Sequence, residues 1–230
     1  MKNLLLLSAS SYKDTGYLVH CKDWVEEFYS VLNDDEILYI PYASVTKSYD
    51  EVEKRVKDFF DLNIKSIHHY ENPIKAVQNA KAFMVNGGNT FKLINEIYKN
   101  KIFDALKQSC QNGALYFGWS AGSNIAGINI QTTNDMPIVY PSSFDALNLI
   151  DYDINPHFIS GKIPGHNGES REQRLNEFMI ENKNIKILAL PEGSGLLVKD
   201  DKILVVGFGE ILQMQFDKAT KKTAPGFYIE

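Results

Sequence analysis

Residues 114–122 read Ala114-Leu115-Tyr116-Phe117-Gly118-Trp119-Ser120-Ala121-Gly122. The apolar first half has the length and composition of a buried strand, and the run that follows Ser120 can start a helix. Two glycines flank the junction, where the turning backbone leaves little room for larger side chains. The stretch therefore predicts a strand that passes directly into a helix, which is the repeating step of an α/β fold.

The same alternation of short apolar runs and segments of helical period extends outward in both directions from this stretch. The expected strands are Leu4–Ser8, Ile37–Ile40, Ile64–His68, Ala82–Val85, Ala114–Gly118 and Ile185–Leu190. The expected helices are Val19–Leu32, Val52–Leu62, Pro73–Asn79, Thr90–Tyr98, Phe103–Gln111 and Arg171–Asn182. The region between Asn129 and Ile154 has weak periodicity and predicts loop and short strand.

Three later runs, Gly195–Val198, Ile203–Gly207 and Ile211–Phe216, favour antiparallel strands at the C-terminal end. We therefore predict an α/β three-layer sandwich of the flavodoxin-like kind, with a mostly parallel sheet and helices on both faces. No Pro/Gly/Ser-rich linker divides the 230 residues, so we expect a single domain over residues 1–230.

The composition, 44% hydrophobic and 23% charged, is ordinary for a globular protein. The net charge of -5, with no basic cluster longer than Lys221-Lys222, argues against nucleic acid as a partner. The apolar run near the N-terminus is too short for a signal peptide or a membrane span, so we expect no membrane contact. Cys21 and Cys110 lie far apart, which fits a reducing compartment and predicts a cytoplasmic protein.

Metal-binding patterns are weak in this sequence. His68-His69 is an adjacent pair whose side chains would diverge on a strand. Neither a His-Glu-x-x-His nor a Cys-x-x-Cys pattern occurs. We therefore expect neither a metal site nor a cofactor.

The pattern Gly118-x-Ser120-x-Gly122 is that of a nucleophile elbow, in which a serine projects from the edge of a sheet. The non-catalytic alternative is a Gly-Ser turn that closes a βα unit. A serine hydroxyl needs a base to become nucleophilic at neutral pH. His157, in Asn155-Pro156-His157-Phe158, is the best placed of the five histidines, because Pro156 restricts the backbone before it in the irregular region after the elbow.

The other histidines are weaker candidates for the base. His20, His68 and His69 fall on early helices and strands, whereas His166 shares the irregular region with His157. A lone histidine is more often structural than catalytic, and this alternative stays open for both His157 and His166.

Two carboxylates compete for the second ring nitrogen of the base. Glu192 follows an apolar strand, which should place it at the carboxyl edge of a parallel sheet where Ser120 also sits. Asp135 lies in the loop that follows the expected nucleophile helix. Each could equally belong to a solvated turn, so the sequence leaves the third member of a catalytic triad open between Asp135 and Glu192.

The run Gly87-Gly88-Asn89-Thr90 follows an expected strand and opens a helix. Backbone N–H groups at such a turn can point at a developing oxyanion, and we predict Gly88 and Ala121 as the donors. A plain βα turn with Thr90 as N-cap is the alternative and is compatible with this role. No Gly-Lys-Ser/Thr follows, so the turn is not a phosphate loop.

These motifs resemble the peptidase E family, the aspartyl dipeptidases of bacteria, over nearly the whole chain. The matching runs are Gly87-Gly88-Asn89-Thr90-Phe91, Gly118-Trp119-Ser120-Ala121-Gly122-Ser123-Asn124, Thr133-Asn134-Asp135-Met136-Pro137, Asn155-Pro156-His157-Phe158, Gly165-His166-x-Gly168-Glu169-Ser170-Arg171-Glu172-Gln173-Arg174 and Leu190-Pro191-Glu192-Gly193. Ser170 stands where a threonine is common in the family, a mild departure.

The resemblance implies a class I glutamine amidotransferase-like fold, with serine where those enzymes carry cysteine. It implies Ser120 as nucleophile and His157 as base, and it does not decide between Asp135 and Glu192. It also implies substrates with an N-terminal aspartate, whose side chain Arg171 could pair, because a guanidinium offers two parallel donors to a carboxylate. A solvated helix flank, paired with Glu172 or Glu177, is the alternative for Arg171 and its neighbour Arg174.

We therefore predict a serine-type dipeptidase that cleaves Asp-Xaa through a Ser-His-Asp/Glu relay and an acyl-enzyme. Its partner is a small peptide with an N-terminal aspartate, held with the help of Arg171 and Asn89, and the chain is a monomer or small homo-oligomer. A cyanophycinase-like hydrolase of aspartyl polymers is one alternative, and a non-catalytic flavodoxin-like binding module is another. A lipase-type esterase is disfavoured, because no histidine follows His166 whereas Glu192 comes later in the chain.

Overall fold

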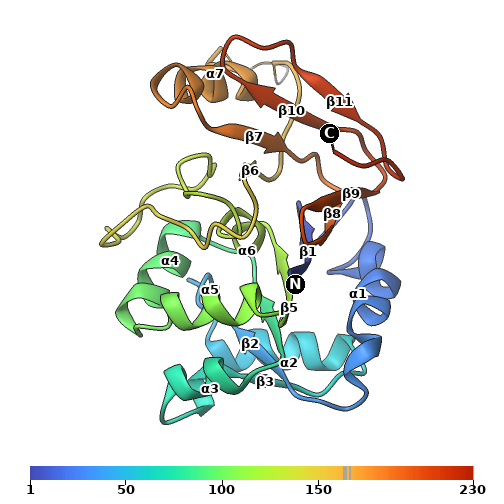
Figure 1. Ribbon diagram of the computed structural model, residues 1–230, viewed down its shortest axis with the longest axis vertical. Helices are drawn as coiled ribbons and strands as arrows, with labels where there is room; N and C mark the ends of the chain where they lie inside the picture. Colours follow the sequence, from blue (N-terminus) through green and yellow to red (C-terminus); the bar gives the residue numbers. More distant parts are fainter. Residues whose placement is uncertain (163–164, 166, 230) are drawn as a thin grey trace.

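The computed structural model describes residues 1–162, 165 and 167–229. A seven-stranded sheet with strand order β3-β2-β4-β5-β1-β8-β9 lies at the centre of the fold (Figure 1). Its strands are β1 (Asn3–Leu7), β2 (Ile37–Ile40), β3 (Ile64–Ser66), β4 (Ala82–Val85), β5 (Leu115–Trp119), β8 (Ser194–Lys199) and β9 (Lys202–Gly207). The first five in spatial order are parallel, and β8 and β9 complete the sheet in antiparallel fashion.

Helices cover both faces of this sheet. They are α1 (Lys22–Tyr29), α2 (Tyr49–Phe59), α3 (Pro73–Asn79), α4 (Thr90–Lys99), α5 (Phe103–Gln111) and α6 (Ala121–Asn124), with short 3-10 turns η1 (Val19–Cys21), η2 (Ser30–Leu32) and η3 (Ile67–His69). Alternate residues of β1 point to opposite faces: Leu5 and Leu7 pack with the core residues of α1 and α2, and Leu4 and Leu6 with those of α3 to α6. The predicted three-layer α/β fold is confirmed.

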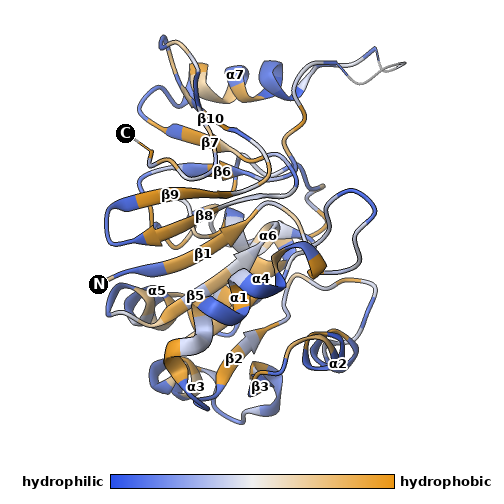
Figure 2. Ribbon diagram, turned by 90° about the vertical axis from the view of Figure 1, so that its right-hand side faces the viewer, coloured by the Kyte–Doolittle hydropathy of each residue, from blue (hydrophilic) through white to orange (hydrophobic). Residues whose placement is uncertain are grey.

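The chain also forms a second, four-stranded sheet with order β11-β10-β7-β6. Its strands are β6 (Asp153–Asn155), β7 (Lys186–Ala189), β10 (Ile211–Gln215) and β11 (Lys221–Thr223), and α7 (Arg171–Glu181) packs against it through Leu175 and Met179. Figure 2 shows β1, β8 and β9 of the larger sheet and β7 of the smaller sheet largely in orange, the colour of hydrophobic residues. Glu192 follows β7 of the smaller sheet and lies just before β8 of the larger one, where Gly195 pairs with Leu7. Leu7 also pairs with Trp119, the residue before Ser120, so Glu192 and Ser120 lie at the same edge of the larger sheet.

The helix ends follow local rules of capping. Ser48 and Ser170 each accept a hydrogen bond from the N–H three residues later, and Glu51 and Gln173 bond back, so that both α2 and α7 begin with a capping box. Over the part of the chain that the structure describes, none of these helices combines the length and the apolar character that a membrane span requires.

Candidate active site

Ser120 occupies a sharp turn between β5 and α6. Its φ of 53° and ψ of -112° are unusual for a residue with a side chain, and its N–H donates to Leu7 O at 3.0 Å. A Cβ on Gly122 would lie 2.3 Å from Val85 O, and one on Gly118 would lie 2.5 Å from Gly122 O. The turn thus requires both glycines, as a nucleophile elbow does.

His157 follows β6 and lies between Ser120 and Glu192. Its Nε2 is 2.8 Å from Ser120 Oγ, and its Nδ1 is 2.8 Å from Glu192 Oε1. An ionised carboxylate can only accept, so Nδ1 carries the proton and Nε2 is free to accept from the serine hydroxyl. His157 also has a positive φ of 53°, and Ser8 Oγ accepts its backbone N–H at 2.9 Å. The three side chains form one hydrogen-bonded series that can move a proton away from Ser120.

Asp135 lies elsewhere in the site. Its Oδ2 accepts from the backbone N–H of Thr90 at 2.7 Å and from Thr133 Oγ1 at 3.2 Å, at the N-terminus of α4 where the helix dipole favours a negative charge. Between the described residues, no hydrogen bond links Asp135 with His157. Of the two competing carboxylates, the structure brings Glu192 to the histidine and Asp135 to the helix.

The glycine-rich turn before α4 abuts the serine. A Cβ on Gly87 would come within 3.0 Å of Ser120 Cβ, and Gly88, with φ of 146°, leaves no room for one because Ala43 O lies 2.3 Å away. Asn89, rather than Thr90, is the N-cap of α4: its Oδ1 accepts from Lys92 N, and its Nδ2 donates to Met136 O at 2.9 Å. Its amide is therefore already engaged by protein groups.

Ser120 and His157 open onto a cleft of about 550 Å³. Its lining residues are Ser10, Tyr17, Ala43, Ser44, Val45, Thr46, Lys47, Val52, Arg55, Asn86, Gly87, Gly88, Asn89, Trp119, Ser120, Asp135 and His157. The formally charged side chains in that lining are Lys47, Arg55 and Asp135, and the Arg55 guanidinium stacks 3.6 Å from the centre of the Tyr17 ring. Lys47 and Arg55 follow the carboxyl end of β2, and this position is the signal by which sequence reasoning could have found them.

Arg171 begins α7 and hydrogen-bonds Asn134 Oδ1. Asn134 Nδ2 in turn donates to Pro156 O at 2.7 Å, so Arg171 is one side chain away from the residue before His157. Arg171 lies with Arg174 beside a small separate pocket, outside the cleft lining. Burial lowers the pKa of Arg171, as does the nearby Arg174 charge, and Asp135 opposes this effect. The rival base His166 lies outside the described residues.

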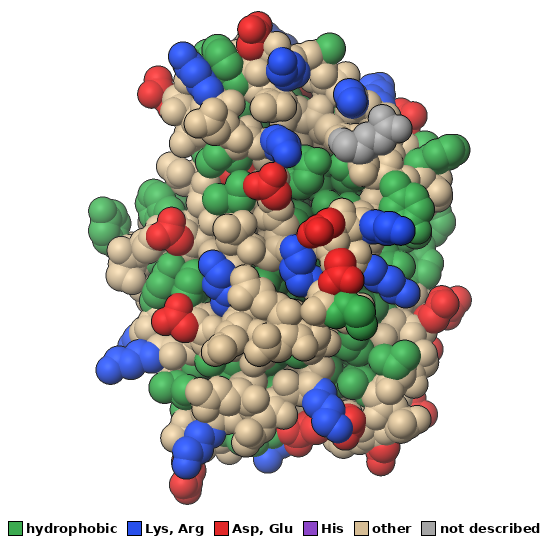
Figure 3. Space-filling model, viewed as in Figure 1, with side chains coloured by type: hydrophobic (Ala, Val, Ile, Leu, Met, Phe, Trp, Pro, Cys, Tyr) green, Lys and Arg blue, Asp and Glu red, His purple; other side chains and the backbone are tan. Residues whose placement is uncertain are grey.

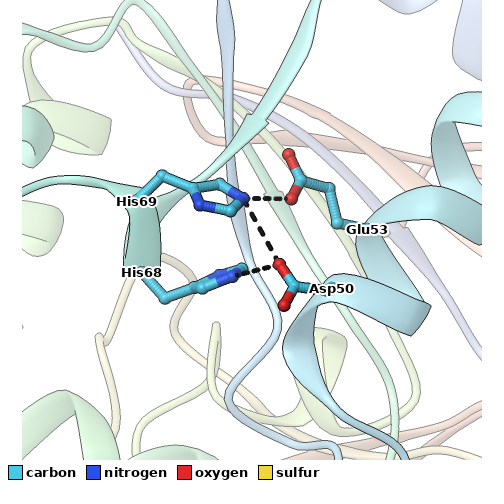
Figure 4. A group of neighbouring side chains, drawn as sticks. All are labelled: Asp50, Glu53, His68 and His69. Carbon is cyan, nitrogen blue, oxygen red and sulfur yellow. Dashed lines mark hydrogen bonds and ion pairs between the residues drawn. The ribbon is translucent and has the colours of Figure 1, made fainter.

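The expectation that His68 and His69 diverge is wrong. Strand β3 ends at Ser66, and the chain enters the 3-10 turn η3 instead of continuing extended. The two imidazole rings lie 3.9 Å apart, and both face carboxylates of α2 (Figure 4).

The α/β sheet edge and the Ser120–His157–Glu192 series are typical of hydrolases, and this is the class in which we place the chain. It belongs to peptidase family S51, whose model matches residues 4–206. A protein named peptidase E from Actinobacillus pleuropneumoniae serotype 5b is 46% identical over 231 residues, covering 97% of this chain and 99% of the relative. Another protein of that name, from Haemophilus influenzae strain Rd, is 47% identical over 203 residues, covering 87% of this chain and 93% of the relative.

A solved structure supports the fold independently. The crystal structure of a peptidase from an acI-B1 actinobacterium superimposes with a TM-score of 0.73 at 16% identity, covering 100% of this chain and 96% of that one. The family match and the similar proteins named peptidase E confirm the predicted family, and the chain is a peptidase.

Proposed function

We propose that the chain is a serine-type dipeptidase that hydrolyses Asp-Xaa dipeptides through an acyl-enzyme. The observation that carries this proposal is the series of two 2.8 Å hydrogen bonds that joins Ser120, His157 and Glu192 beside the cleft. Such a series supplies both the activated nucleophile and the proton carrier that acyl transfer needs.

The proposed steps use the hydrogen bonds of His157 with Ser120 and Glu192, together with the oxyanion donors predicted from the sequence. Ser120 Oγ attacks the peptide carbonyl while His157 Nε2 takes the hydroxyl proton, and the N–H groups of Gly88 and Ala121 stabilise the oxyanion. His157 then donates that proton to the leaving amine, which leaves an ester between Ser120 and the aspartyl residue. Water, activated by the same histidine, hydrolyses the ester and restores the serine. Glu192 orients the ring and stabilises its charged form.

The charges of the cleft complement the substrate. An Asp-Xaa dipeptide has one ammonium and two carboxylates, and the charged side chains of the cleft lining are Asp135, Lys47 and Arg55. In this assignment Asp135 pairs with the substrate's amino group, and the cations pair with its carboxylates. Arg171, held next to the site by Asn134, is the second candidate partner for the aspartyl side chain. Asn89 acts indirectly, because its side-chain amide donates to Met136 O and so holds the loop that contains Asp135.

The test compares Asp-Leu with Leu-Leu, Asn-Leu and N-acetyl-Asp-Leu, using the wild-type protein and Ser120→Ala. We expect Asp-Leu to be the best substrate, with kcat roughly 10⁴-fold lower or worse in the variant. Equal rates for Ser120→Ala would refute the serine mechanism. Equal cleavage of the acetylated peptide would refute recognition of the free amine, and faster cleavage of an aspartyl polymer would favour the cyanophycinase-like alternative.

Two further variants separate the candidate partners of the aspartyl side chain. Arg55→Ala and Arg171→Ala remove one guanidinium each from different elements, α2 and α7. The variant that loses the preference for Asp-Leu over Asn-Leu identifies the partner, because only the charge of the first side chain differs between these substrates. An unchanged preference in both would refute pairing by either arginine.

Cellular location and oligomeric state are part of the proposal. Cys21 and Cys110 are both free and buried, which supports a reducing compartment such as the cytoplasm. Light scattering coupled to size exclusion would test the expectation of a monomer or small homo-oligomer.

A further inference from the structure

Four side chains with metal-binding groups converge on the face of α2 that packs toward η3 (Figure 4). Asp50 and Glu53 lie one helical turn apart on α2, and His68 and His69 lie in the 3-10 turn that follows β3. One ligand atom from each residue lies within 4.8 Å of the other three. The cluster is outside the cleft that contains Ser120.

We propose that Asp50, Glu53, His68 and His69 bind one divalent transition-metal ion of the Zn²⁺ type. Two imidazole nitrogens and two carboxylate oxygens make a four-coordinate set that Zn²⁺ accepts, and the two carboxylates neutralise its charge. Mg²⁺ and Ca²⁺ prefer sets made of oxygen alone, so the two imidazoles select against them.

Three of the six separations between the donor atoms are close to those of a tetrahedral site, and all six are within 4.8 Å. Asp50 Oδ1 is 2.9 Å from His68 Nε2 and 3.6 Å from His69 Nε2, and Glu53 Oε2 is 2.6 Å from His69 Nε2. Zn–N and Zn–O bonds of roughly 2.0–2.1 Å require donor separations of about 3.3 Å. Small side-chain movements suffice, and the Asp50 side chain, 76% exposed, is free to make them.

Neighbouring groups already orient these ligands. Ser66 Oγ lies 2.6 Å from His68 Nδ1, and the backbone N–H of Ser66 donates to Glu53 Oε1 at 3.0 Å. Lys57 Nζ contacts the same carboxylate oxygen at 2.9 Å, so Oε2 is left to face His69. Metal-binding histidines are typically fixed in this way through their second nitrogen.

Ser66 also accounts for the ring proton of His68. In the tautomer with the proton on Nε2, His68 donates to Asp50, and Nδ1 accepts from the Ser66 hydroxyl. With the ion on Nε2, the ring proton moves to Nδ1, and Ser66 Oγ becomes the acceptor.

The ion would join α2 to the turn after β3. Because Val52 and Arg55 on the opposite side of α2 line the active-site cleft, this link would hold one wall of the cleft in place. The role is structural, and the proposed dipeptidase mechanism does not depend on it.

The primary test titrates chelator-treated full-length protein with Zn²⁺ by calorimetry and with Co²⁺ by visible absorption. We expect one ion per chain, the intense absorption of four-coordinate Co²⁺, and a rise in Tm of roughly 5–10 °C at Zn²⁺ concentrations about 100-fold above Kd. Mg²⁺ should have no such effect. Absence of heat, absorption and Tm change with Zn²⁺ and Co²⁺ would overturn the proposal.

Variants decide where the ion binds, because His157 and Glu192 form another histidine–carboxylate pair. Asp50→Asn and His69→Gln should each raise the Kd for Zn²⁺ at least about 10-fold, whereas the matched control His157→Gln should leave it unchanged. Binding that is lost in His157→Gln and retained in His69→Gln would place the ion at the catalytic pair and overturn the proposal. If His69→Gln does not fold, the exposed Asp50 decides the question.

Discussion

The two sheets supply different halves of the candidate site. In the larger sheet, the neighbouring parallel strands β4 and β5 lead to Gly88 and Ser120. In the smaller sheet, the neighbouring parallel strands β6 and β7 lead to His157 and Glu192. The rule that functional groups gather at the carboxyl ends of parallel strands thus applies twice. Each half is built locally, but the proton relay exists only where the two halves meet.

The end of β1 joins these halves. Leu7 O accepts the N–H of Ser120, and the fully buried Ser8 Oγ accepts the N–H of His157 while it donates to Leu190 O at 2.8 Å. Two consecutive residues therefore fix the backbones of the proposed nucleophile and base. The comparison of the two sheets indicates that the relative positions of Ser120 and His157 depend on this contact at the end of β1 more than on either sheet alone.

The largest difference between the two sides of the site is expected when its two carboxylates, Glu192 and Asp135, are substituted. Glu192→Gln removes the negative charge on the smaller-sheet side, and we expect kcat for Asp-Leu to fall about 100-fold with little change in KM. A buried triad carboxylate is worth roughly 10⁴-fold. Glu192 is half exposed, so water can partly replace it.

Asp135→Asn is the matched change on the side of the larger sheet. We expect its KM to rise roughly 10-fold, because a charge-assisted bond to the substrate's amine is lost. Steady-state kinetics of both variants on Asp-Leu make the comparison. If Asp135→Asn instead lowered kcat far more than Glu192→Gln, then Asp135 would be the acid of the relay, and the assignment of base and acid to one sheet would fail.

A smaller effect is expected at the contact between the sheets. Ser8→Ala leaves the N–H of His157 without its acceptor, and the resulting shift of the ring should lower kcat about 10-fold with KM nearly unchanged. Ser109→Ala is the control, since Ser109 Oγ on α5 donates to Val77 O on α3 at 3.2 Å, and both helices pack against the larger sheet. Equal losses of kcat in both variants would show that Ser8 has no positioning role.

Elements of the larger sheet could be predicted closely from the sequence. The strands Ile37–Ile40 and Ala82–Val85 and the helices Pro73–Asn79 and Phe103–Gln111 have the predicted bounds. Their signals are local: continuous apolar runs mark buried parallel strands, and Asn72 with Pro73 marks a helix start. The division into two sheets could not be predicted, because an apolar run does not specify which strand it pairs with.

The site shows the same limit. The backbone conformation at Ser120 is determined by the residues of its own turn, so a local motif suffices to predict it. The choice between Asp135 and Glu192 depends on contacts between residues far apart in the chain, and their catalytic roles stay predictions. Lys47 and Arg55 were missed because their one signal, a position after the carboxyl end of β2, does not distinguish them from the other residues of that segment. The cluster at His68 was missed because the end of a three-residue strand leaves little periodicity to detect.

The smallest expected effect is on stability and concerns a second contact, between β6 of the smaller sheet and the segment that follows α6. Asp153 on β6 is fully buried, and its Oδ1 accepts from the N–H groups of Ile128 and Asn129, which follow α6. Burial raises the pKa of Asp153 from 3.8 to about 6, against the opposing effect of these hydrogen bonds. The folded protein therefore takes up a proton before the unfolded chain does, so this residue destabilises the fold above about pH 6 and the penalty disappears as the pH falls toward 4.

Asp153→Asn removes this titration and keeps an acceptor for both N–H groups. Relative to the variant, we expect the wild-type free energy of unfolding to rise by about 1 kcal/mol between pH 7 and pH 5, as measured by urea denaturation. Asp151→Asn is the control, because Asp151 is exposed and pairs with Lys186 at the surface. If the difference in the free energy of unfolding between the wild type and Asp153→Asn did not change with pH, the Asp153 carboxylate would be stable in its charged form. The contact between β6 and the segment after α6 would then be made by a solvated carboxylate and not by a neutral, buried acid.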